Sequence, residues 1–306
     1  MDKPTVQDIF HRFYPAYLDQ YSPSPVQAKV AHNIMNCKTG AYGANVCVCE
    51  DCGFVQIHYN SFRNRCCPMC QAVPKEMWMD ARREDVLDAP YFHLVFTVPD
   101  ILNPVIYSNQ RLLYDALYHA ASSTISELTA DPKRLGAKVG YICILHTWGS
   151  EMNFHPHIHT ILLGGGLTSK NEWKDNGTAF FLPIWAISKV FRGKYMDELK
   201  NLWNTNQLEF HGTAEKYRNH YAFKELIDFC YDAEWIPYCK KTFNGAQSVI
   251  DYLGKYTHRI AISNHRIICM DDGNVTFSVK DYRNKGQWKE LTLSGVEFIR
   301  RFLMHV

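Results

Sequence analysis

The run EMNFHPHIHTILLGGGL, residues 151–167, is the most informative part of this 306-residue sequence. Beyond Pro156 it continues as a short apolar stretch that ends at three glycines, a pattern that predicts a β-strand rather than a helix. Side chains alternate between the two faces of a strand. We therefore expect His157 and His159 to point to the same face, which places two imidazoles side by side.

A second strand is predicted immediately before the first. VGYICILHTW, residues 139–148, is rich in β-branched and aromatic residues, and its connection to the histidine-rich strand is short enough for an antiparallel hairpin. A turn centred between Glu151 and Met152 places His146 opposite His157. Three neutral imidazoles that converge in this way form a divalent-metal site with open positions for a substrate oxygen.

The alternative interpretation of each histidine is a packed or solvated side chain with no metal. The spacing of the pair, together with the independent placement of His146, favours the metal site. His155 has the same parity along the strand, so it could replace His146 or orient one of the ligands.

Two tyrosines, Tyr252 and Tyr256, fall in GAQSVIDYLGKYTHR, where apolar residues recur at helical spacing. Four residues apart on a helix, the two phenols lie on one face. Ordinary core packing is the alternative interpretation of such a pair. Lys255, His258 and Arg259 place positive charge on the same turns, which suits a phosphate group better than a dry core.

The N-terminal region has the spacing of a zinc module. Cys49-x2-Cys52 and Cys67-x2-Cys70 form a four-thiolate pattern with two knuckles. Disulfides are the alternative, but no secretory signal precedes the region and we expect a cytosolic protein, in which thiols stay reduced. The four cysteines are therefore predicted to hold one structural zinc ion. Candidate ligands of a second zinc ion are Cys37, Cys47, His58 and Cys66.

Three segments follow one another along the chain: HTWGSEMNFHPHIH, YLGKYTHRIAISNHRI and FSVKDYR. In these segments the chain resembles the two-tyrosine HUH transposases of rolling-circle insertion sequences, the IS91-like group that includes the ISCR elements. HUH denotes histidine, hydrophobe, histidine, which here corresponds to His157, Ile158 and His159. The resemblance covers nearly the whole chain and implies the palm-like nuclease sheet common to HUH enzymes.

The resemblance also implies a reaction. Magnesium or manganese holds the scissile phosphate of single-stranded DNA, and a tyrosine attacks it to leave a 5'-phosphotyrosine and a free 3'-hydroxyl. The covalent link preserves the bond energy for rejoining, so no nucleotide cofactor is implied. The implied partners are single-stranded DNA at element-end hairpins and at the target site, with no membrane. A phenol with a pKa of about 10 is a weak nucleophile, and a divalent ion assists it by polarising the phosphoryl oxygens.

The N-terminal region resembles the zinc-binding domain of the same transposases, in which NSCRNRHCPKCQ is usual. This chain has NSFRNRCCPMCQ, so Phe62 stands in place of a cysteine and Cys66 in place of a histidine. The departure leaves the second zinc ion open. Family members commonly continue beyond Val306, which is consistent with a shortened chain.

Charge is distributed unevenly along the sequence. The formal net charge is only +2, which argues against a histone-like DNA binder. Residues 240–306 contain eleven Lys and Arg against six Asp and Glu, whereas residues 150–239 contain nine against eleven. Positive charge thus gathers around and after the tyrosine helix, where a DNA backbone would pass, although a solvated surface is the alternative. The candidate DNA-binding residues are Lys255, His258, Arg259, Lys280, Arg283, Arg63 and Arg65.

The expected fold is α+β, with a central antiparallel sheet flanked by helices. We expect an N-terminal helical segment over residues 1–36, a zinc-binding DNA-recognition domain over residues 37–90 and an HUH nuclease domain over residues 91–306. The expected elements of the last domain are a strand from Tyr91, a long helix over 104–128, a mainly helical region over 183–235, a hairpin turning at 272–274 and a helix from near Ser294.

The function that fits best is therefore a rolling-circle transposase that nicks and joins single-stranded DNA in the bacterial cytosol. A plasmid relaxase or replication initiator would use the same chemistry on different DNA. A zinc-dependent DNA-binding regulator without catalysis is the alternative from another class.

Overall fold

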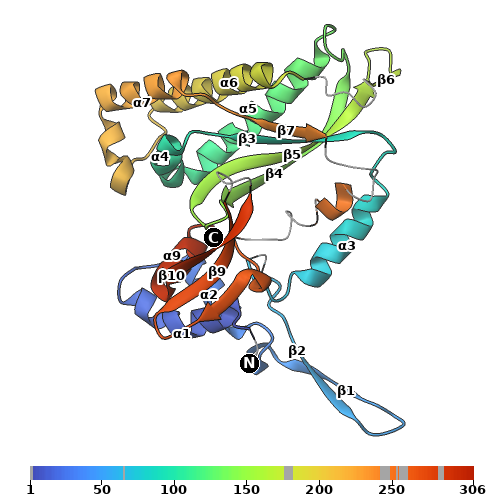
Figure 1. The fold of residues 1–306 in the computed structure, drawn as a ribbon, viewed down its shortest axis with the longest axis vertical. Helices are drawn as coiled ribbons and strands as arrows, with labels where there is room; N and C mark the ends of the chain where they lie inside the picture. The colour runs from blue at the N-terminus through green and yellow to red at the C-terminus, as the bar shows by residue number, and fades with distance from the viewer. Residues whose placement is uncertain are drawn as a thin grey trace. The chain divides into compact units, whose positions relative to one another are not determined.

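The computed structural model describes residues 3–64, 66–175, 182–241, 249–252, 254, 261–281 and 286–306 (Figure 1). These residues combine helices with antiparallel β-sheets, which confirms the expected α+β class. Contacts between residues divide the chain into two compact units. The first unit comprises Met1–Arg82, Trp148–Phe154 and Leu253–Val306, and the second comprises Arg83–Thr147 and His155–Tyr252.

The first unit begins with two helices, α1 (Val6–Leu18) and α2 (Pro25–Asn36). Each starts with a capping box, formed by Thr5 in α1 and by Ser24 in α2, which satisfies the free N–H groups of the first turn. The aromatic residues Phe10, Phe13, Tyr14 and Tyr17 are buried along α1. The prediction of an N-terminal helical segment is confirmed.

A three-stranded antiparallel sheet shares its core with these helices. It contains β8 (Ile267–Met270), β9 (Asn274–Asp281) and β10 (Gln287–Ser294), in the order β10-β9-β8, and is followed by α9 (Gly295–Leu303). The side chain of Ser294 caps α9, as expected. The sequence does not predict β10, because most of its residues are exposed and only pairing with β9 makes it a strand.

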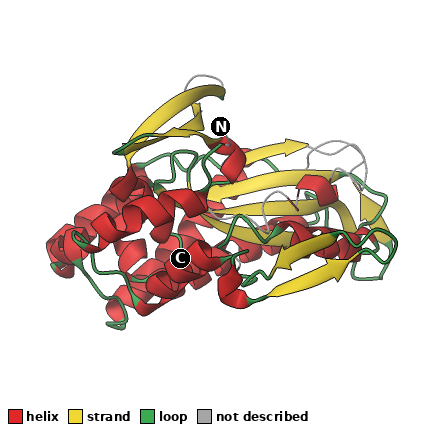
Figure 2. Ribbon diagram, turned by 90° about the horizontal axis from the view of Figure 1, so that it is seen from below, coloured by secondary structure: helices red, strands yellow, loops and turns green. Residues whose placement is uncertain are grey.

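The cysteine-rich region forms a two-stranded arm, visible in both views (Figures 1 and 2). After the short 3-10 helix η1 (Gly40–Tyr42), strand β1 (Ala44–Val48) pairs antiparallel with β2 (Val55–Tyr59). All ten residues of the two strands are exposed. The register places three cross-strand pairs of mainly apolar side chains on one face of this arm: Ala44 with Tyr59, Val46 with Ile57, and Val48 with Val55. Helix α3 (Ala72–Arg83) follows the arm.

The second unit is built on a sheet of strands of different lengths, in the order β4-β5-β3-β7. Strand β3 (Tyr91–Thr97) lies in the middle and pairs antiparallel with β5 (Phe154–Leu167) and with β7 (Tyr238–Lys241). Strand β4 (Lys138–Trp148) borders β5, which confirms the predicted hairpin, and β6 (Trp173–Asp175) pairs with the end of β5.

Helices of the second unit cover one face of this sheet. They are η2 (Asp100–Leu102), α4 (Asn103–Ser108), α5 (Gln110–Ala130), α6 (Ile184–Asn204), η3 (Gly212–Arg218) and α7 (His220–Asp232), with α5 and α6 side by side in Figure 1. The helix predicted over 104–128 is interrupted at Asn109, whose side chain donates to the carbonyls of Val105 and Glu209 at 2.9 and 2.7 Å. None of the helices in the described ranges is long and apolar enough to cross a membrane.

The two faces of the sheet have opposite character because side chains alternate along β3. Phe96 points to the helices and its ring lies 4.9 Å from that of Phe191 on α6. The register pairs Phe96 with Ile158 and Val95 with His159, so the apolar partners share the helix-covered face. The opposite face receives His93 and the histidines of β5.

The close pairing of β4 and β5 generates a stability prediction. A Cβ atom at Gly166 would lie 2.2 Å from the carbonyl oxygen of Lys138, a backbone atom that cannot move aside cheaply. We expect Gly166→Ala to lower the free energy of unfolding by about 1–3 kcal/mol or more. At Gly193 on α6 nothing lies within 4 Å of such an atom, so Gly193→Ala should raise that free energy by about 0.5–1 kcal/mol. Urea unfolding of both variants tests the contrast, and equal stabilities would contradict the strand placement.

Candidate active site and metal centres

Three histidines converge on the face of the second unit's sheet that lies opposite the helices. His146 comes from β4, and His157 and His159 come from β5; their candidate ligand atoms all lie within 4.8 Å of one another. The Nε2 atoms of His157 and His159 are 3.1 Å apart. An ion bound at 2.0–2.1 Å to two imidazoles would separate their nitrogens by about 3.0–3.4 Å. The arrangement therefore fits a single divalent ion.

The backbone fixes the orientation of His157. Its Nδ1 lies 2.7 Å from the carbonyl oxygen of His155, so an Nδ1–H donates there and leaves the lone pair of Nε2 facing the other histidines. The ring of His155 turns away, with Nδ1 3.1 Å from Oδ1 of Asp100. His155 thus contributes its carbonyl to the orientation of a ligand, and its imidazole stands outside the group of three.

Burial keeps the imidazoles of His157 and His159 neutral. It is the largest cause that lowers the pKa of His157, to about 3, and the neighbouring His146 lowers it further. The pKa of His159 is lowered well below its usual range, again chiefly by burial and then by the positive charge that His157 and His146 would carry. Metal ligation requires a neutral imidazole, so the site is ready for an ion at neutral pH.

A fourth histidine joins the cluster to a tyrosine. His93, on β3, has its Nε2 atom 2.6 Å from the phenol oxygen of Tyr252 and 2.8 Å from Nδ1 of His159. The same phenol oxygen lies 3.5 Å from Nδ1 of His159. Burial lowers the pKa of His93 to about 4, so the ring stays neutral and one of its nitrogens can accept a hydrogen bond. Tyr252 therefore lies beside the candidate metal ligands, linked to them through His93.

Sequence reasoning missed His93, although a signal existed. In FHLVFTVP the residues Phe92, Leu94 and Phe96 alternate as apolar side chains, which leaves His93 on the other face. What the sequence could not provide is the register of β3 against β5, more than sixty residues away, and that register sets Val95 opposite His159.

The predicted DNA-binding residues are only partly within the described chain. Lys280 is exposed on β9, with its ammonium 5.3 Å from the centre of the Trp288 ring, and Arg63 is exposed in the segment after β2. The residues that lie outside the described ranges are Tyr256, Lys255, His258, Arg259, Arg283 and Arg65.

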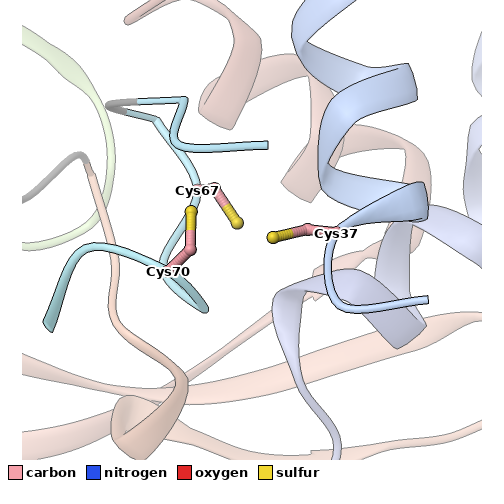
Figure 3. Close-up of side chains that lie close together, drawn as sticks. All are labelled: Cys37, Cys67 and Cys70. Atoms are coloured by element: carbon pink, nitrogen blue, oxygen red, sulfur yellow. The ribbon is translucent and has the colours of Figure 1, made fainter. Parts of the chain in front are cut away.

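A second potential metal centre is formed by cysteines of the first unit. The sulfur atoms of Cys37, Cys67 and Cys70 lie within 4.8 Å of one another and are buried. Figure 3 shows the three side chains pointing toward a common centre, with Cys37 at the end of α2 and the other two on the segment before α3. A hydrogen bond from the thiol of Cys67 is the largest cause that lowers the pKa of Cys70, to about 6. Three converging thiols with one prone to ionise suit zinc.

This grouping differs from the four-cysteine set expected from spacing. Cys49 and Cys52 are exposed at the tip of the arm, where Gly53, at φ +71°, makes the tight turn. Hydrogen bonds from Cys52 are the largest cause that lowers the pKa of Cys49. Among the described residues, groups of three or more candidate ligands occur only at the histidine and cysteine centres. Of the second candidate set, Cys37 joins the buried cysteines, Cys47 and His58 are exposed on the arm, and Cys66 is buried beside Cys67.

Comparison with protein families gives two matches. Residues 140–306, more than half of the chain, match a family described as "Putative transposase". Residues 9–98 match a family described as "Transposase zinc-binding domain". The matches together include the cysteine centre, most of the β4–β5 hairpin and Tyr252.

Individual proteins are also similar. "Putative transposase y4qJ" of Sinorhizobium fredii is 39% identical over 305 residues, which are 99% of this chain and 77% of that protein. The transposase for insertion sequence element IS801 of Pseudomonas savastanoi pv. phaseolicola is 28% identical over 291 residues, 92% of this chain and 67% of that protein. A structure of conjugative relaxase TrwC with oriT DNA shares 14% identity at a TM-score of 0.31, over 57% of this chain and 72% of that chain. That score is too low to establish a shared fold.

The cysteine centre generates a prediction about zinc content. In a His157→Ala background, which removes the histidine site, we expect Cys37→Ser to lose the zinc that copurifies with the chain, because a buried ligand is removed. Cys49→Ser, changed at an exposed thiol outside the cluster, should retain it. Zinc per chain is measured by plasma mass spectrometry. Equal loss in both variants would instead favour the set of Cys49, Cys52, Cys67 and Cys70.

The lowered pKa values generate a prediction about metal binding and pH. Protons compete with a metal for an imidazole only below its pKa, so His157 should begin to protonate near pH 3 rather than near 6.5. We expect the affinity for Mn²⁺ to fall by less than about tenfold between pH 7.5 and 5.5, whereas three ordinary histidines would lose about a thousandfold. Electron paramagnetic resonance of free Mn²⁺ measures this affinity, with His157→Ala as the control for unspecific binding. A thousandfold loss would show that the imidazoles are solvated.

Proposed function

This chain belongs to the IS91-type family of insertion-sequence transposases, and we propose that it nicks and joins single-stranded DNA through a covalent bond to Tyr252. The proposal rests on the position of the Tyr252 phenol oxygen, which lies 2.6 Å from Nε2 of His93 and 3.5 Å from Nδ1 of His159. A nucleophile this close to candidate metal ligands can reach a phosphate held by the same ion. An aromatic residue that served only core packing would not require these polar neighbours.

The reaction follows from these positions. The phenol oxygen of Tyr252 forms a bond to phosphorus, and the bond from phosphorus to the 3'-oxygen of the preceding nucleotide breaks. The phenol proton leaves through the hydrogen bond to His93, and the 3'-oxygen takes up a proton to become a hydroxyl. The product is a 5'-phosphotyrosine, whose attack by a 3'-hydroxyl restores a phosphodiester. Bonds are exchanged one for one, so no nucleotide cofactor is needed.

The chain's own residues prepare this step. His93 orients the phenol and receives its proton, because a ring kept neutral by burial accepts the hydrogen bond of the phenol. His146, His157 and His159 would hold magnesium or manganese, which when bound polarises the phosphoryl oxygens and supports their developing charge. We include Tyr256 as the second nucleophile of the family pattern, for the other strand of a transposition event.

The first unit supplies the structural zinc in this proposal. Cys37, Cys67 and Cys70 would hold the ion, and a tetrahedral site needs one further donor. Cys66 is the candidate adjacent in sequence, since it is buried next to Cys67 and stands where the family commonly has a histidine. The zinc then orders the segment that carries Arg63, which is exposed and available to DNA.

The partner we propose is single-stranded DNA at the ends of the element and at its target. In this proposal, residues 37–90 recognise the DNA and residues 91–306 carry out catalysis. The proposed place of action is the bacterial cytosol, where the element's DNA lies.

A covalent-adduct assay tests the nucleophile. We expect the protein, mixed with Mn²⁺ and labelled single-stranded DNA from the ends of its element, to give a labelled adduct on a denaturing gel. Tyr252→Phe should abolish the first adduct without weakening DNA binding, because only the phenol oxygen is removed. Tyr256→Phe is the matched control and should retain that adduct, while the double variant should form none. An adduct that persists in the double variant would overturn the tyrosine assignment.

The rate of the same reaction tests His93. At saturating Mn²⁺ and DNA, His93→Ala should slow single-turnover adduct formation by roughly 10- to 100-fold, the usual effect of losing a residue that orients a reacting group. His93→Gln, whose amide oxygen can still accept a hydrogen bond, should recover part of the rate. Unchanged rates in both variants would show that the contact with Tyr252 is only structural.

A further inference from the structure

The second unit contains a cavity that the proposed chemistry does not use. It has a volume of about 320 Å³ and lies between the start of α6 and the segment that precedes β7. Ile184 and Trp185 from α6 form one wall, and Glu234 and Ile236 form the other. Cavities of this size are large enough for a small planar ligand.

The walls of this cavity are apolar and unusually exposed. The Trp185 side chain is 69% exposed and that of Ile236 is 64% exposed. Buried Trp235 anchors the second wall, because its indole N–H donates to the carbonyl of Cys230 at 2.8 Å. An exposed indole and an exposed aliphatic side chain on a fixed backbone therefore line the same cavity, and a planar ring can pack against them.

The rim of the cavity carries positive charge. Lys189 is exposed on the next turn of α6, and Arg134 holds its guanidinium 5.9 Å from the centre of the Trp185 ring. Arg192 lines the interior and donates to the carbonyl of Tyr231 at 2.7 Å, which fixes its position. A ring that entered the cavity would thus bring an attached phosphate close to Lys189, whereas Arg134 is paired with Asp131 at 3.6 Å.

Glu234 contributes the one carboxylate among the lining residues. A carboxylate accepts hydrogen bonds and repels a phosphate, so it suits the edge of a ring that carries an amino group. Cytosine, adenine and guanine have such a group, and thymine does not.

The chain connects this cavity to the candidate active site. Ile236 is two residues before Tyr238, a distance of about 7 Å along an extended chain. The ring of Tyr238, half-exposed on β7, lies 5.7 Å from the ring of His93. Tyr238, which contacts His93, therefore follows the cavity wall along the same short segment.

We propose that this cavity binds an unpaired base of single-stranded DNA outside the active site, with the base stacked on Trp185. The inference rests on the proposed function, which supplies single-stranded DNA as the partner. Stacking on an aromatic face tolerates any base, while Glu234 favours bases with an amino group. Lys189 then contacts the neighbouring phosphate.

A second cavity of the same unit offers a matched control. It also has a volume of about 320 Å³ and also contains a tryptophan, Trp173. Its polar lining is acidic, from Asp88 and Asp175, and the indole N–H of Trp173 donates to Asp175 at 3.0 Å. An acidic cavity repels a DNA backbone, so the same substitution there should leave DNA binding unchanged.

The test is fluorescence anisotropy of labelled oligodeoxycytidylate and oligodeoxythymidylate, without added divalent ion so that no cleavage occurs. We expect Trp185→Ala to weaken binding of oligodeoxycytidylate by roughly 5- to 150-fold, the loss of one stacked base. Trp185→Phe, which keeps a ring, should recover much of the affinity, and Trp173→Ala should bind as the wild type does. The wild type should prefer oligodeoxycytidylate, and Glu234→Gln should reduce that preference.

Other results separate this inference from the proposed function. Wild-type affinity in Trp185→Ala, with normal adduct formation, would overturn the base-binding cavity and leave the nuclease proposal standing. Absence of both DNA binding and adduct in the wild-type protein would overturn both. Circular dichroism of each variant checks that it still folds. Lys189→Glu is a second variant of the same cavity and should also weaken DNA binding.

Discussion

The alternation of side chains along β3 and β5 is the constraint on which the second unit depends. Side chains of one parity, such as Phe96 and Ile158, pack in the core under the helices. Side chains of the other parity, such as His93 and His159, lie on the opposite face of the sheet. A shift of the register by one residue would bury the imidazoles under the helices and expose the apolar side chains, so the core and the candidate active site are specified together. The hydrophobic effect that holds α6 to the sheet is also what aligns the histidines.

Burial gives the histidine cluster its chemical character. Imidazoles in ordinary solvent are partly protonated at neutral pH, but burial lowers the pKa of His157 to about 3 and that of His93 to about 4. Neutral rings can act both as ligands and as hydrogen-bond acceptors, which is what a metal-assisted tyrosine needs. The polar groups that remain are matched to specific partners, such as the carbonyl of His155 for His157.

Local patterns predicted much of the fold. The N-terminal helices, the β4–β5 hairpin and the helix that begins after Ser294 follow from residues close together in sequence, and the structure confirms them. Features that depend on distant residues were missed, namely β7 and β10, which become strands only by pairing with β3 and β9. The contact of His93 with Tyr252 and the approach of Cys37 to Cys67 and Cys70 have the same origin, since spacing rules describe only ligands that are close in sequence.

The arm formed by β1 and β2 has a consequence for the behaviour of the protein at high concentration. Within the described residues it is a sheet of two strands, so each strand has an edge of unpaired backbone groups. One face presents Val46, Val48 and Ile57, each more than half exposed. Exposed edges beside an apolar face can pair with strands of other molecules. Solutions of the purified chain should therefore self-associate as concentration rises, unless a partner molecule shields the arm.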